Sequence, residues 1–471
     1  MKRFLGVFII LILNFPVQAQ DTLSLARAIS IGLKNNFDVQ IEQLNVEIAQ
    51  SNNTWGQAGR YPTISFAANQ NNSVVQRKPA NPFAVAGRNI SDNINGQLDV
   101  QLILFDGFSI RVNKQRLDQL EKLSYGNSTF VMETTLQSII LAYYQALLEK
   151  ERLQILENNM SFSKERYDYV KLRKELGGAI SFDVLQEQNN YLTDSANVLL
   201  QGIVYKNSLR QLNLLLNENM QKSYELVDSL SYKHEVYDYD DLRSKMVSSN
   251  TNLKNQYINQ EILRSNTKLQ EANLYPTISI NVGGNGSLDQ LNANFRTPTG
   301  NTVTNTVGFV NGNSAEPVTN TVNETALMPL TQTGNSYGGY ANLSLRVNLF
   351  NGGQIKRAIE NSRVQEKIAE LNTDQLKLSL ENDLLANYDM YNLRNQLVSI
   401  ALTKLKAADL NLDLANERYR NGALSAIDLR IVQENARNAA LDAYLAIFNS
   451  ISSKIGLIRI TGGLIDQAPR N

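Results

Sequence analysis

The chain has 471 residues, of which 42% are hydrophobic, and its 45 basic and 45 acidic residues leave no formal net charge. This balance lacks the basic excess of a nucleic-acid-binding protein. The absence of cysteine excludes disulfides, thiol catalysis and cysteine metal sites, and the single histidine, His234, has no second histidine with which to bind a metal. There is also no Gly-rich phosphate loop after a predicted strand and no HExxH motif. The sequence therefore predicts no enzyme, no metal site and no cofactor.

The first residues have the pattern of an export signal. The basic pair Lys2 and Arg3 precedes an apolar run at residues 4–13, and small residues suited to cleavage end at Ala19. This run is shorter than the ~20 residues that a membrane-spanning helix needs, so we predict a signal peptide at residues 1–19. No later segment has the ~18 uninterrupted apolar residues of a transmembrane helix, so any membrane crossing would have to use strands.

An internal repeat runs through the rest of the chain. Tyr-Pro-Thr-Ile-Ser occurs at residues 61–65 and again at 275–279, and Leu-Phe-Asp-Gly at 104–107 is echoed by Leu-Phe-Asn-Gly at 349–352. The second pair is separated by 245 positions, and the same offset relates Tyr143 to Tyr388, Gly177 to Gly422 and Asp183 to Asp428. One structural plan is therefore predicted to occur twice in the chain.

The repeat divides the exported chain into two halves. We predict a first structural repeat at residues 20–220, an inter-repeat linker at 221–240, a second repeat at 241–458 and a C-terminal tail at 459–471. Each repeat is predicted to follow the order helix, strand, loop, strand, very long helix, turn, helix.

Each repeat contains one predicted strand hairpin, at residues 61–105 and 275–350. Apolar and polar residues alternate in both hairpins; in the first, the apolar positions include Leu98, Val100, Leu102 and Leu104. Soluble sheets show the same alternation. Together with an export signal, however, it suits a barrel of ~10-residue strands with lipid outside and water inside.

The segments that precede and join the strands carry further signals. Both hairpins begin after a Tyr-Pro step, Tyr61-Pro62 or Tyr275-Pro276, which marks a helix–strand junction because proline disfavours helix in the preceding residue. The second hairpin carries an insertion, at about residues 285–338, that is rich in Asn, Thr and Gly. Its composition predicts a long loop, which would be extracellular if the strands belong to an outer-membrane barrel.

The predicted helices are unusually long. No proline occurs between Ser109 and Glu175, and neither proline nor glycine occurs between Gln354 and Asn421. Some 65 helical residues would extend about 100 Å. Apolar residues recur at spacings of three and four, which predicts side-by-side packing; they include Leu136, Ile140, Tyr143, Leu147, Leu429, Val432, Ala436, Ala439 and Ala443. Helices with so narrow an apolar seam line a water-filled tube or stand as exposed rods.

The strand count predicts an oligomer. Two hairpins supply four strands, whereas the smallest membrane barrels have about eight. Open strand edges in lipid would leave backbone groups unpaired, at a cost of several kcal/mol each. Three copies would supply about twelve strands, a number that can close. The sequence therefore predicts a homotrimer with one shared barrel.

The order and duplication of these motifs resemble the TolC-type outer membrane efflux proteins over residues 20–460. The signatures are helix–YP–strand, strand–LF(D/N)G–helix, and a glycine followed six residues later by aspartate. The resemblance implies a mainly α-helical protein with a membrane β-barrel, in which a trimer shares a 12-stranded barrel in the outer membrane and an α-helical barrel in the periplasm. It implies a passive exit duct for drugs, small molecules or polypeptides in tripartite efflux or type I secretion. The implied partners are a periplasmic adaptor and an inner-membrane transporter.

The turns of the two helical hairpins are the predicted tips. Gly177, Gly178 and Gly422 provide the expected helix stop, and the resemblance implies that these tips dock the adaptor. Asp183 and Asp428 follow early in the next helices. Each aspartate either favours the helix N-terminus, which is worth ~0.3–1 kcal/mol, or joins a ring of carboxylates facing a narrow axis.

The resemblance favours the ring. An aspartate six residues after the tip glycine lines the closed periplasmic entrance in this family, which matches Asp183 and Asp428. A tyrosine three residues before the glycine helps to hold that entrance shut, and it matches Tyr419. Two further family residues are missing, because Leu424 replaces an arginine and Ile431 replaces a second carboxylate. The gate is therefore expected to be held by fewer polar links.

A second class of function stays open at this point. Long helical hairpins also suit a periplasm-spanning structural rod or an adaptor coiled coil without a pore. The paired alternating strands in each repeat favour the channel over the rod.

Overall fold

The structure is a computed structural model that describes residues 21–81 and 85–464. The predicted signal peptide and most of the predicted C-terminal tail lie outside the described residues. The chain divides into two compact units. We call Asn53–Leu117 with Arg264–Arg363 the sheet unit, and Met1–Asn52, Asp118–Leu263 and Val364–Asn471 the helical unit. Each unit takes segments from both sequence repeats, so the compact units do not coincide with the repeats.

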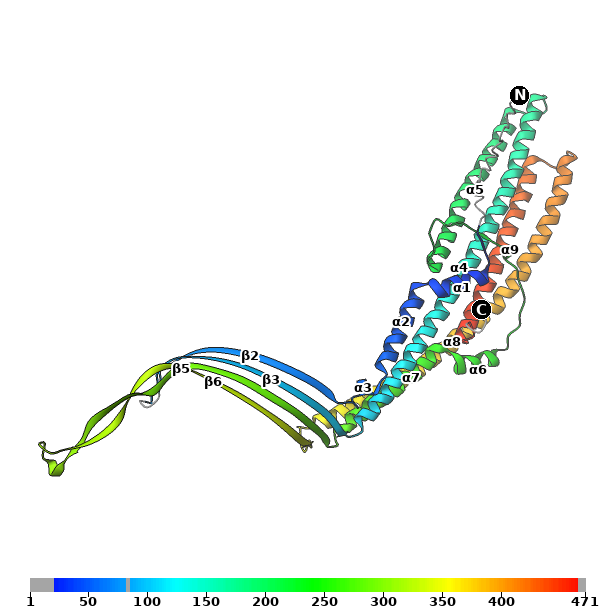
Figure 1. The fold of residues 1–471 in the computed structure, drawn as a ribbon. Coiled ribbons are helices and arrows are strands. Elements are labelled where there is room, and N and C mark those ends of the chain that lie inside the picture. The colour runs from blue at the N-terminus through cyan, green and yellow to red at the C-terminus, as the bar shows by residue number, and fades with distance from the viewer. Residues whose placement is uncertain (1–20, 82–84, 465–471) are drawn as a thin grey trace, which may run out of the picture. The chain divides into compact units, whose positions relative to one another are not determined.

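The sheet unit holds one antiparallel sheet in the order β2-β3-β5-β6 (Figure 1). Its strands are β2 (Thr63–Arg77), β3 (Gly87–Asp106), β5 (Thr277–Phe309) and β6 (Pro317–Arg346). The strand hairpin of each repeat is present, and β3 pairs with β5 to join the two hairpins. This order leaves β2 and β6 as the edge strands of the described sheet.

The predicted loop at about residues 285–338 is wrong. Strands β5 and β6 continue through it and pair with each other as far as Phe309 and Pro317. The pairing places Val303 opposite Val322 and Thr304 opposite Thr321. Threonine and valine are β-branched and favour extended backbone, and this preference outweighs the turn-like content of Asn and Gly.

The two faces of the sheet differ in polarity because successive side chains in a strand point to opposite sides. One row across all four strands consists of Ser65, Asp99, Gly283 and Tyr340. The adjacent row, on the other face, consists of Ile64, Val100, Val282 and Ala341. The apolar face is uncovered, since Phe66 and Leu343 are each 72% exposed. The predicted alternation is thus confirmed as an amphipathic sheet.

The helical unit is built around two long helical hairpins. The first hairpin joins α4 (Ser109–Glu175) to α5 (Ser181–Leu216), and the second joins α8 (Gln354–Arg420) to α9 (Ala426–Ile460). Helices α4 and α8 each have 67 residues. Their first residues are 245 positions apart in the sequence, and so are their last residues. The repeat offset seen in the sequence is therefore also present in the structure.

Shorter elements complete the chain. They are β1 (Asp21–Leu23), α1 (Leu25–Asn35), α2 (Phe37–Asn52), α3 (Trp55–Ala58), β4 (Tyr224–Leu226), α6 (Tyr239–Ser249), α7 (Thr251–Ala272) and the 3-10 turn η1 (Val310–Gly312). In the predicted linker, β4 pairs in parallel with β1 and α6 begins at Tyr239. The linker is therefore tied to the helical unit rather than free of it.

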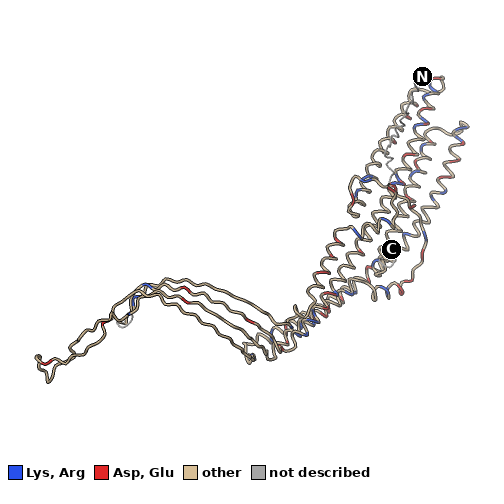
Figure 2. The backbone as a smooth tube through the Cα atoms, in the orientation of Figure 1, with Lys and Arg blue, Asp and Glu red and all other residues tan. Residues whose placement is uncertain are grey.

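The core of the helical unit lies where the predicted apolar seam meets these short elements. Leu136, Tyr143 and Leu147 are at most 1% exposed. The Tyr143 hydroxyl lies 2.9 Å from the carbonyl oxygen of Leu23 and 2.6 Å from a carboxylate oxygen of Asp228, and these two acceptors share its one proton. Lysine, arginine, aspartate and glutamate are interspersed along the helices (Figure 2). Among the described helices, none combines the length and apolar character needed to cross a membrane.

Candidate functional site

The two hairpin tips have the same backbone geometry. Gly177 and Gly422 adopt φ of +79° and +72°, a left-handed conformation that favours glycine. At the first tip the Gly178 amide donates to the Arg173 carbonyl at 2.7 Å, and at the second the Ala423 amide donates to the Arg418 carbonyl at 2.8 Å. Both turns thus satisfy helix-end carbonyls in the way that glycine at a helix stop allows.

Both tip aspartates bind the first turn of the following helix. Asp183 accepts a hydrogen bond from the Ile180 amide at 3.2 Å. Asp428 accepts one from the Ser425 hydroxyl at 2.7 Å, and its own amide donates to that hydroxyl oxygen at 3.1 Å. Both carboxylates are exposed. Within one chain they therefore act as helix N-terminal residues, and the carboxylate ring stays a prediction.

A cleft of about 700 Å³ lies between the two tips in the helical unit. It is lined by residues of both hairpins, among them Gly178, Asp183, Tyr419 and Gly422. The structure therefore brings four of the predicted site residues to one cleft, whereas Gly177 and Asp428 are not part of its lining. Burial raises the pKa of Tyr419, and the nearby Glu187 carboxylate raises it further, so its hydroxyl remains a hydrogen-bond donor.

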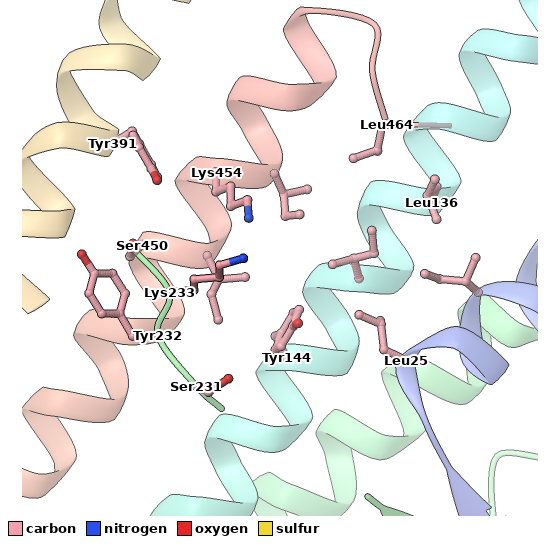
Figure 3. Close-up of a pocket in the computed structure, with 14 residues that line it drawn as sticks. Leu25, Leu136, Tyr144, Ser231, Tyr232, Lys233, Tyr391, Ser450, Lys454 and Leu464 are labelled. Atoms are coloured by element: carbon pink, nitrogen blue, oxygen red, sulfur yellow. The ribbon is translucent and has the colours of Figure 1, made fainter. Parts of the chain in front are cut away.

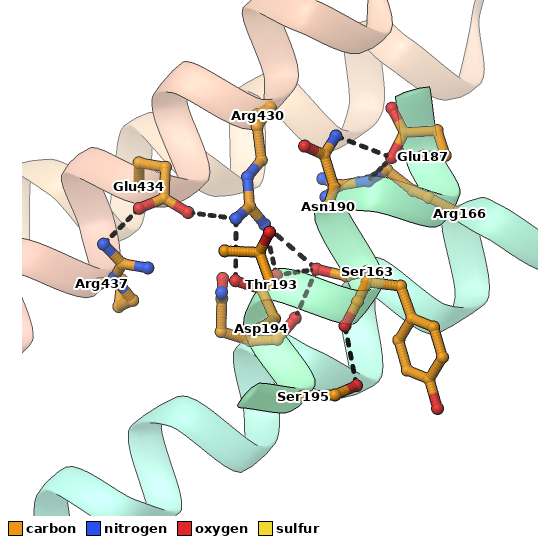
Figure 4. A network of polar contacts seen from close by, with 12 residues as sticks. Ser163, Arg166, Glu187, Asn190, Thr193, Asp194, Ser195, Arg430, Glu434 and Arg437 are labelled. Carbon is orange, nitrogen blue, oxygen red and sulfur yellow. Dashed lines mark hydrogen bonds and ion pairs between the residues drawn. The ribbon is translucent and has the colours of Figure 1, made fainter. Parts of the chain in front are cut away.

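A buried polar network that the sequence did not predict links the two hairpins (Figure 4). Its centre is Asp194 of α5, whose side chain is 2% exposed. Arg430 of α9 donates to both carboxylate oxygens of Asp194, at 2.6 and 2.8 Å, and to the Ser163 hydroxyl of α4 at 3.0 Å. Ser163 is fully buried and also hydrogen-bonds Asp194. Three helices from both repeats therefore meet at one carboxylate.

The network continues on both sides of Asp194. Within α9, Glu434 pairs with Arg430 at 2.7 Å and also with Arg437. Between α4 and α5, Arg166 pairs with Glu187 at 3.3 Å, and both side chains are nearly fully buried. Buried charges are stable only when they are paired in this way, so these residues fix how the helices fit together.

The network predicts how the hairpin contact responds to pH. Burial acts to raise the pKa of Asp194, but the hydrogen bonds from Arg430 and Ser163 outweigh it, so the pKa of this carboxyl lies below its ordinary value. A carboxyl whose pKa is lowered in the folded state contributes its full stabilisation at pH values above its unfolded-state pKa of about 3.9. That contribution is lost as the pH falls through the folded-state pKa. Amide hydrogen exchange near residue 430 should therefore be unchanged between pH 7 and 5 after correction for intrinsic rates. Weakening of the contact already at about pH 5 would contradict this prediction.

A second cavity, of about 310 Å³, lies between α4 and α9 (Figure 3). Its wall is largely apolar, with Leu25, Leu136 and Leu464 among its residues, and Lys454 points into it. The Lys454 ammonium pairs with Glu235 of the inter-repeat linker at 2.8 Å. The cavity therefore marks where the linker is anchored to α9.

The Tyr-Pro steps lie where they were predicted, directly before β2 and β5 in the sheet unit. The rings of Tyr61 and Tyr275 are 62% and 52% exposed. Nearby, the Arg60 guanidinium stands 4.9 Å from the centre of the Trp55 ring. These exposed aromatic rings at the strand ends are typical of a membrane interface. Among the described residues, no group of histidine, aspartate and glutamate is arranged to hold a metal ion.

Comparison with known proteins first defines the class of fold. The chain resembles the CmeC outer membrane channel of Campylobacter jejuni with a TM-score of 0.68 and 14% identity, over 93% of this chain and 85% of that one. It resembles the outer membrane protein VceC of Vibrio cholerae with a TM-score of 0.66 and 13% identity, over 93% and 96%. For the open state of the MtrE outer membrane channel of Neisseria gonorrhoeae, the TM-score is 0.63 and the identity 14%, over 95% and 91%. The fold is thus that of outer membrane channels.

One family model matches part of the sequence. Residues 28–218 match the family model described as "Outer membrane efflux protein". No curated protein matches the sequence significantly. The family match and the shared fold together confirm the resemblance to the TolC-type outer membrane efflux protein family that the repeated motifs predicted.

Proposed function

We propose that this protein is the outer-membrane exit duct of a tripartite efflux or type I secretion system. It would conduct drugs, small molecules or polypeptides passively from the periplasm or an inner-membrane transporter to the exterior. The family match and the fold support this role. The observation that carries the proposal is the four-stranded sheet with one apolar, uncovered face and two edge strands.

This sheet explains why the duct would be a homotrimer in the outer membrane. The apolar face, with Phe66 and Leu343, suits lipid, and the opposite face, with Asp99 and Asn93, suits water. Unpaired backbone groups on β2 and β6 would be costly in lipid. Pairing β6 of one copy with β2 of the next would satisfy them, and three copies would close a 12-stranded barrel, within the size range of about 8 to 26 strands known for such barrels.

The oligomeric state tests the proposal directly. Light scattering of the detergent-extracted protein should give the mass of a trimer, and unheated samples should migrate differently from heated ones on a denaturing gel. A monomer that stays folded in buffer without detergent would contradict the proposal and favour a structural rod or adaptor.

The partners we propose are a periplasmic adaptor and an inner-membrane transporter. The tips at Gly177, Gly178 and Gly422 would dock the adaptor, since they end the long hairpins and flank an open cleft. Cross-linking in intact cells, followed by purification of this protein, should recover both partners. If photo-cross-linkers placed at the tips capture neither the adaptor nor the transporter, this docking is contradicted.

The ring of tip carboxylates remains part of the proposal and can be tested by Asp428→Asn. Asparagine keeps the size of the side chain and its hydrogen bond to Ser425, so α9 should fold normally while three negative charges leave the entrance. Planar-bilayer recordings should show weaker cation preference and weaker block by multivalent cations.

The matched control is Asp240→Asn, which removes an exposed first-turn aspartate from α6, away from the tips. It should leave selectivity and block unchanged. If Asp428→Asn also leaves both unchanged, Asp428 has only its helix-terminal role.

A further inference from the structure

The outermost part of the sheet is a two-stranded ribbon. Strand β3 pairs with β5 only as far as Asn292, and from Ala293 onward β5 pairs only with β6 in the described sheet (Figure 1). We call residues 293–309 and 317–330 the outer ribbon. The helices that precede or follow the four strands join them at their other ends. In the proposed duct, whose helices lie in the periplasm, the outer ribbon therefore stands above the exterior mouth of the barrel.

The face of β6 that would line the water path changes character where the ribbon begins. This face includes Tyr340, and alternate residues of a strand share one face. Counting outward from Tyr340 in steps of two, each residue is glycine or polar as far as Gln332. The next two residues on the same face are Leu330 and Met328. The pairing of β5 with β6 stays in register throughout this stretch, so these residues continue the same face.

Strand β5 changes at the same level. On the face that would line the water path, Asp289 is followed by Leu291 and later by Phe295. On the opposite face, which would contact lipid, the change is reversed, since Leu288 is followed by Gln290. The two faces of the sheet therefore exchange polarity at one level across both strands.

This exchange indicates that the lipid-facing band ends near Gln290 and that protein covers the apolar face beyond it. Apolar side chains that stand in water rather than lipid gain free energy when they are covered. The chain covers part of this face itself, since Ala293 is only 6% exposed, but Met328 and Leu330 remain 46% and 43% exposed. A two-stranded ribbon is also at best marginally stable alone in water. A further surface is therefore needed opposite Met328 and Leu330.

The symmetry of the proposed trimer identifies that surface. In a closed barrel each copy turns the same face toward one axis, so the surface opposite this part of the outer ribbon is the same part of the other two copies. The apolar stretch is short. It ends at Glu324, whose carboxylate accepts a hydrogen bond from the Thr299 hydroxyl at 2.9 Å, beside a break in the register of β5 and β6. The contact would therefore be a narrow band directly above the barrel.

We propose that Leu291, Phe295, Met328 and Leu330 of three copies pack together as an apolar collar that narrows the exterior mouth of the duct. This inference rests on the proposed trimeric duct. A hydrophobic constriction opposes the passage of water and ions, because they lose hydration there. The apolar collar would thus hinder entry of hydrophilic solutes from outside, and it would part when cargo arrives from the barrel.

Cross-linking of introduced cysteines tests the contact. The chain has no cysteine, so a short bis-maleimide reacts only with introduced thiols. Met328→Cys should give covalent dimers on a denaturing gel, because equivalent residues of different copies meet at the axis. The matched control is Leu327→Cys, the next residue, which is 52% exposed on the opposite face and should give monomers. Absence of dimers from Met328→Cys, or equal linking of both variants, would overturn the apolar collar.

Access from outside tests what the apolar collar does. Asn342→Cys places a thiol on the Tyr340 face of β6, inside the barrel and below the collar. On intact cells, a membrane-impermeant maleimide should label it about tenfold faster or more when Met328→Asp and Leu330→Asp are added, since loss of apolar burial shifts the collar toward its open state. Leu327→Asp, on the opposite face, should leave the labelling rate unchanged. Equal rates in all three backgrounds would overturn the constriction.

Light scattering separates failure of this inference from failure of the proposed function. A trimer in detergent whose Met328→Cys variant stays unlinked overturns the apolar collar and leaves the duct intact. A monomer in detergent overturns both.

Discussion

Replacing Asp194 with alanine is expected to destabilise the contact between the two helical hairpins by about 3 kcal/mol. Removal of one partner from a buried ion pair costs about 3–5 kcal/mol, because the other charge stays buried without its partner. The lower end applies here, since Arg430 keeps its 2.7 Å pair with Glu434. Faster amide hydrogen exchange in α5 and α9, and a lower temperature of trimer dissociation, would measure the effect.

The other repeat provides the matched control for this variant. The triple change Ser163→Ala, Asp194→Ala and Arg430→Leu gives the network the residues found at positions 408, 439 and 185. Because both charges leave together, it should recover most of the lost stability. Equal destabilisation by the single and triple variants would contradict the account of the network as a paired-charge contact.

The second large effect is expected from Gly107→Ala in the strand-to-helix turn of the first repeat. Gly107 has φ of +69°, and an added Cβ would lie 2.5 Å from the carbonyl oxygen of Ala272. The left-handed conformation costs alanine about 1–2 kcal/mol, and the backbone clash adds about 1–3 kcal/mol. The yield of heat-resistant trimer should fall strongly.

Gly352→Ala is the matched control, because Gly352 occupies the same place in the second repeat. It has φ of +66°, but an added Cβ there meets no atom within 4 Å. This variant should show only the conformational cost of about 1–2 kcal/mol. If the two variants lose the same amount of trimer, close packing against Ala272 is not the reason for Gly107.

Much of the fold could be predicted from the sequence because it depends on local signals. The lack of proline over residues 109–175 indicated a long helix, and α4 spans those residues. Alternation around Leu98 and Val100 gave the faces of the sheet. Composition failed at residues 285–338, because β-branched residues there, such as Val303 and Thr304, favour extended strands over the loop that Asn and Gly indicate.

The site was harder to predict because its main contacts are not local. On a polar helix, Asp194 and Arg430 look like solvated residues. They are buried only because α5 and α9 pack together and bring these two residues, 236 positions apart in the sequence, into contact. The available signal was the break in the repeat, at which Asp194 corresponds to Ala439. For Asp428 the sequence left two interpretations, and the single chain shows only the helix-terminal one.

The central claim is that copies of this chain pool their strands to enclose one water-filled path through a membrane. Single-channel recording of the purified protein in planar bilayers tests it most directly. We predict discrete, uniform conductance steps that appear only with the trimeric fraction. A bilayer that remains electrically silent while the trimer is demonstrably inserted would contradict the account.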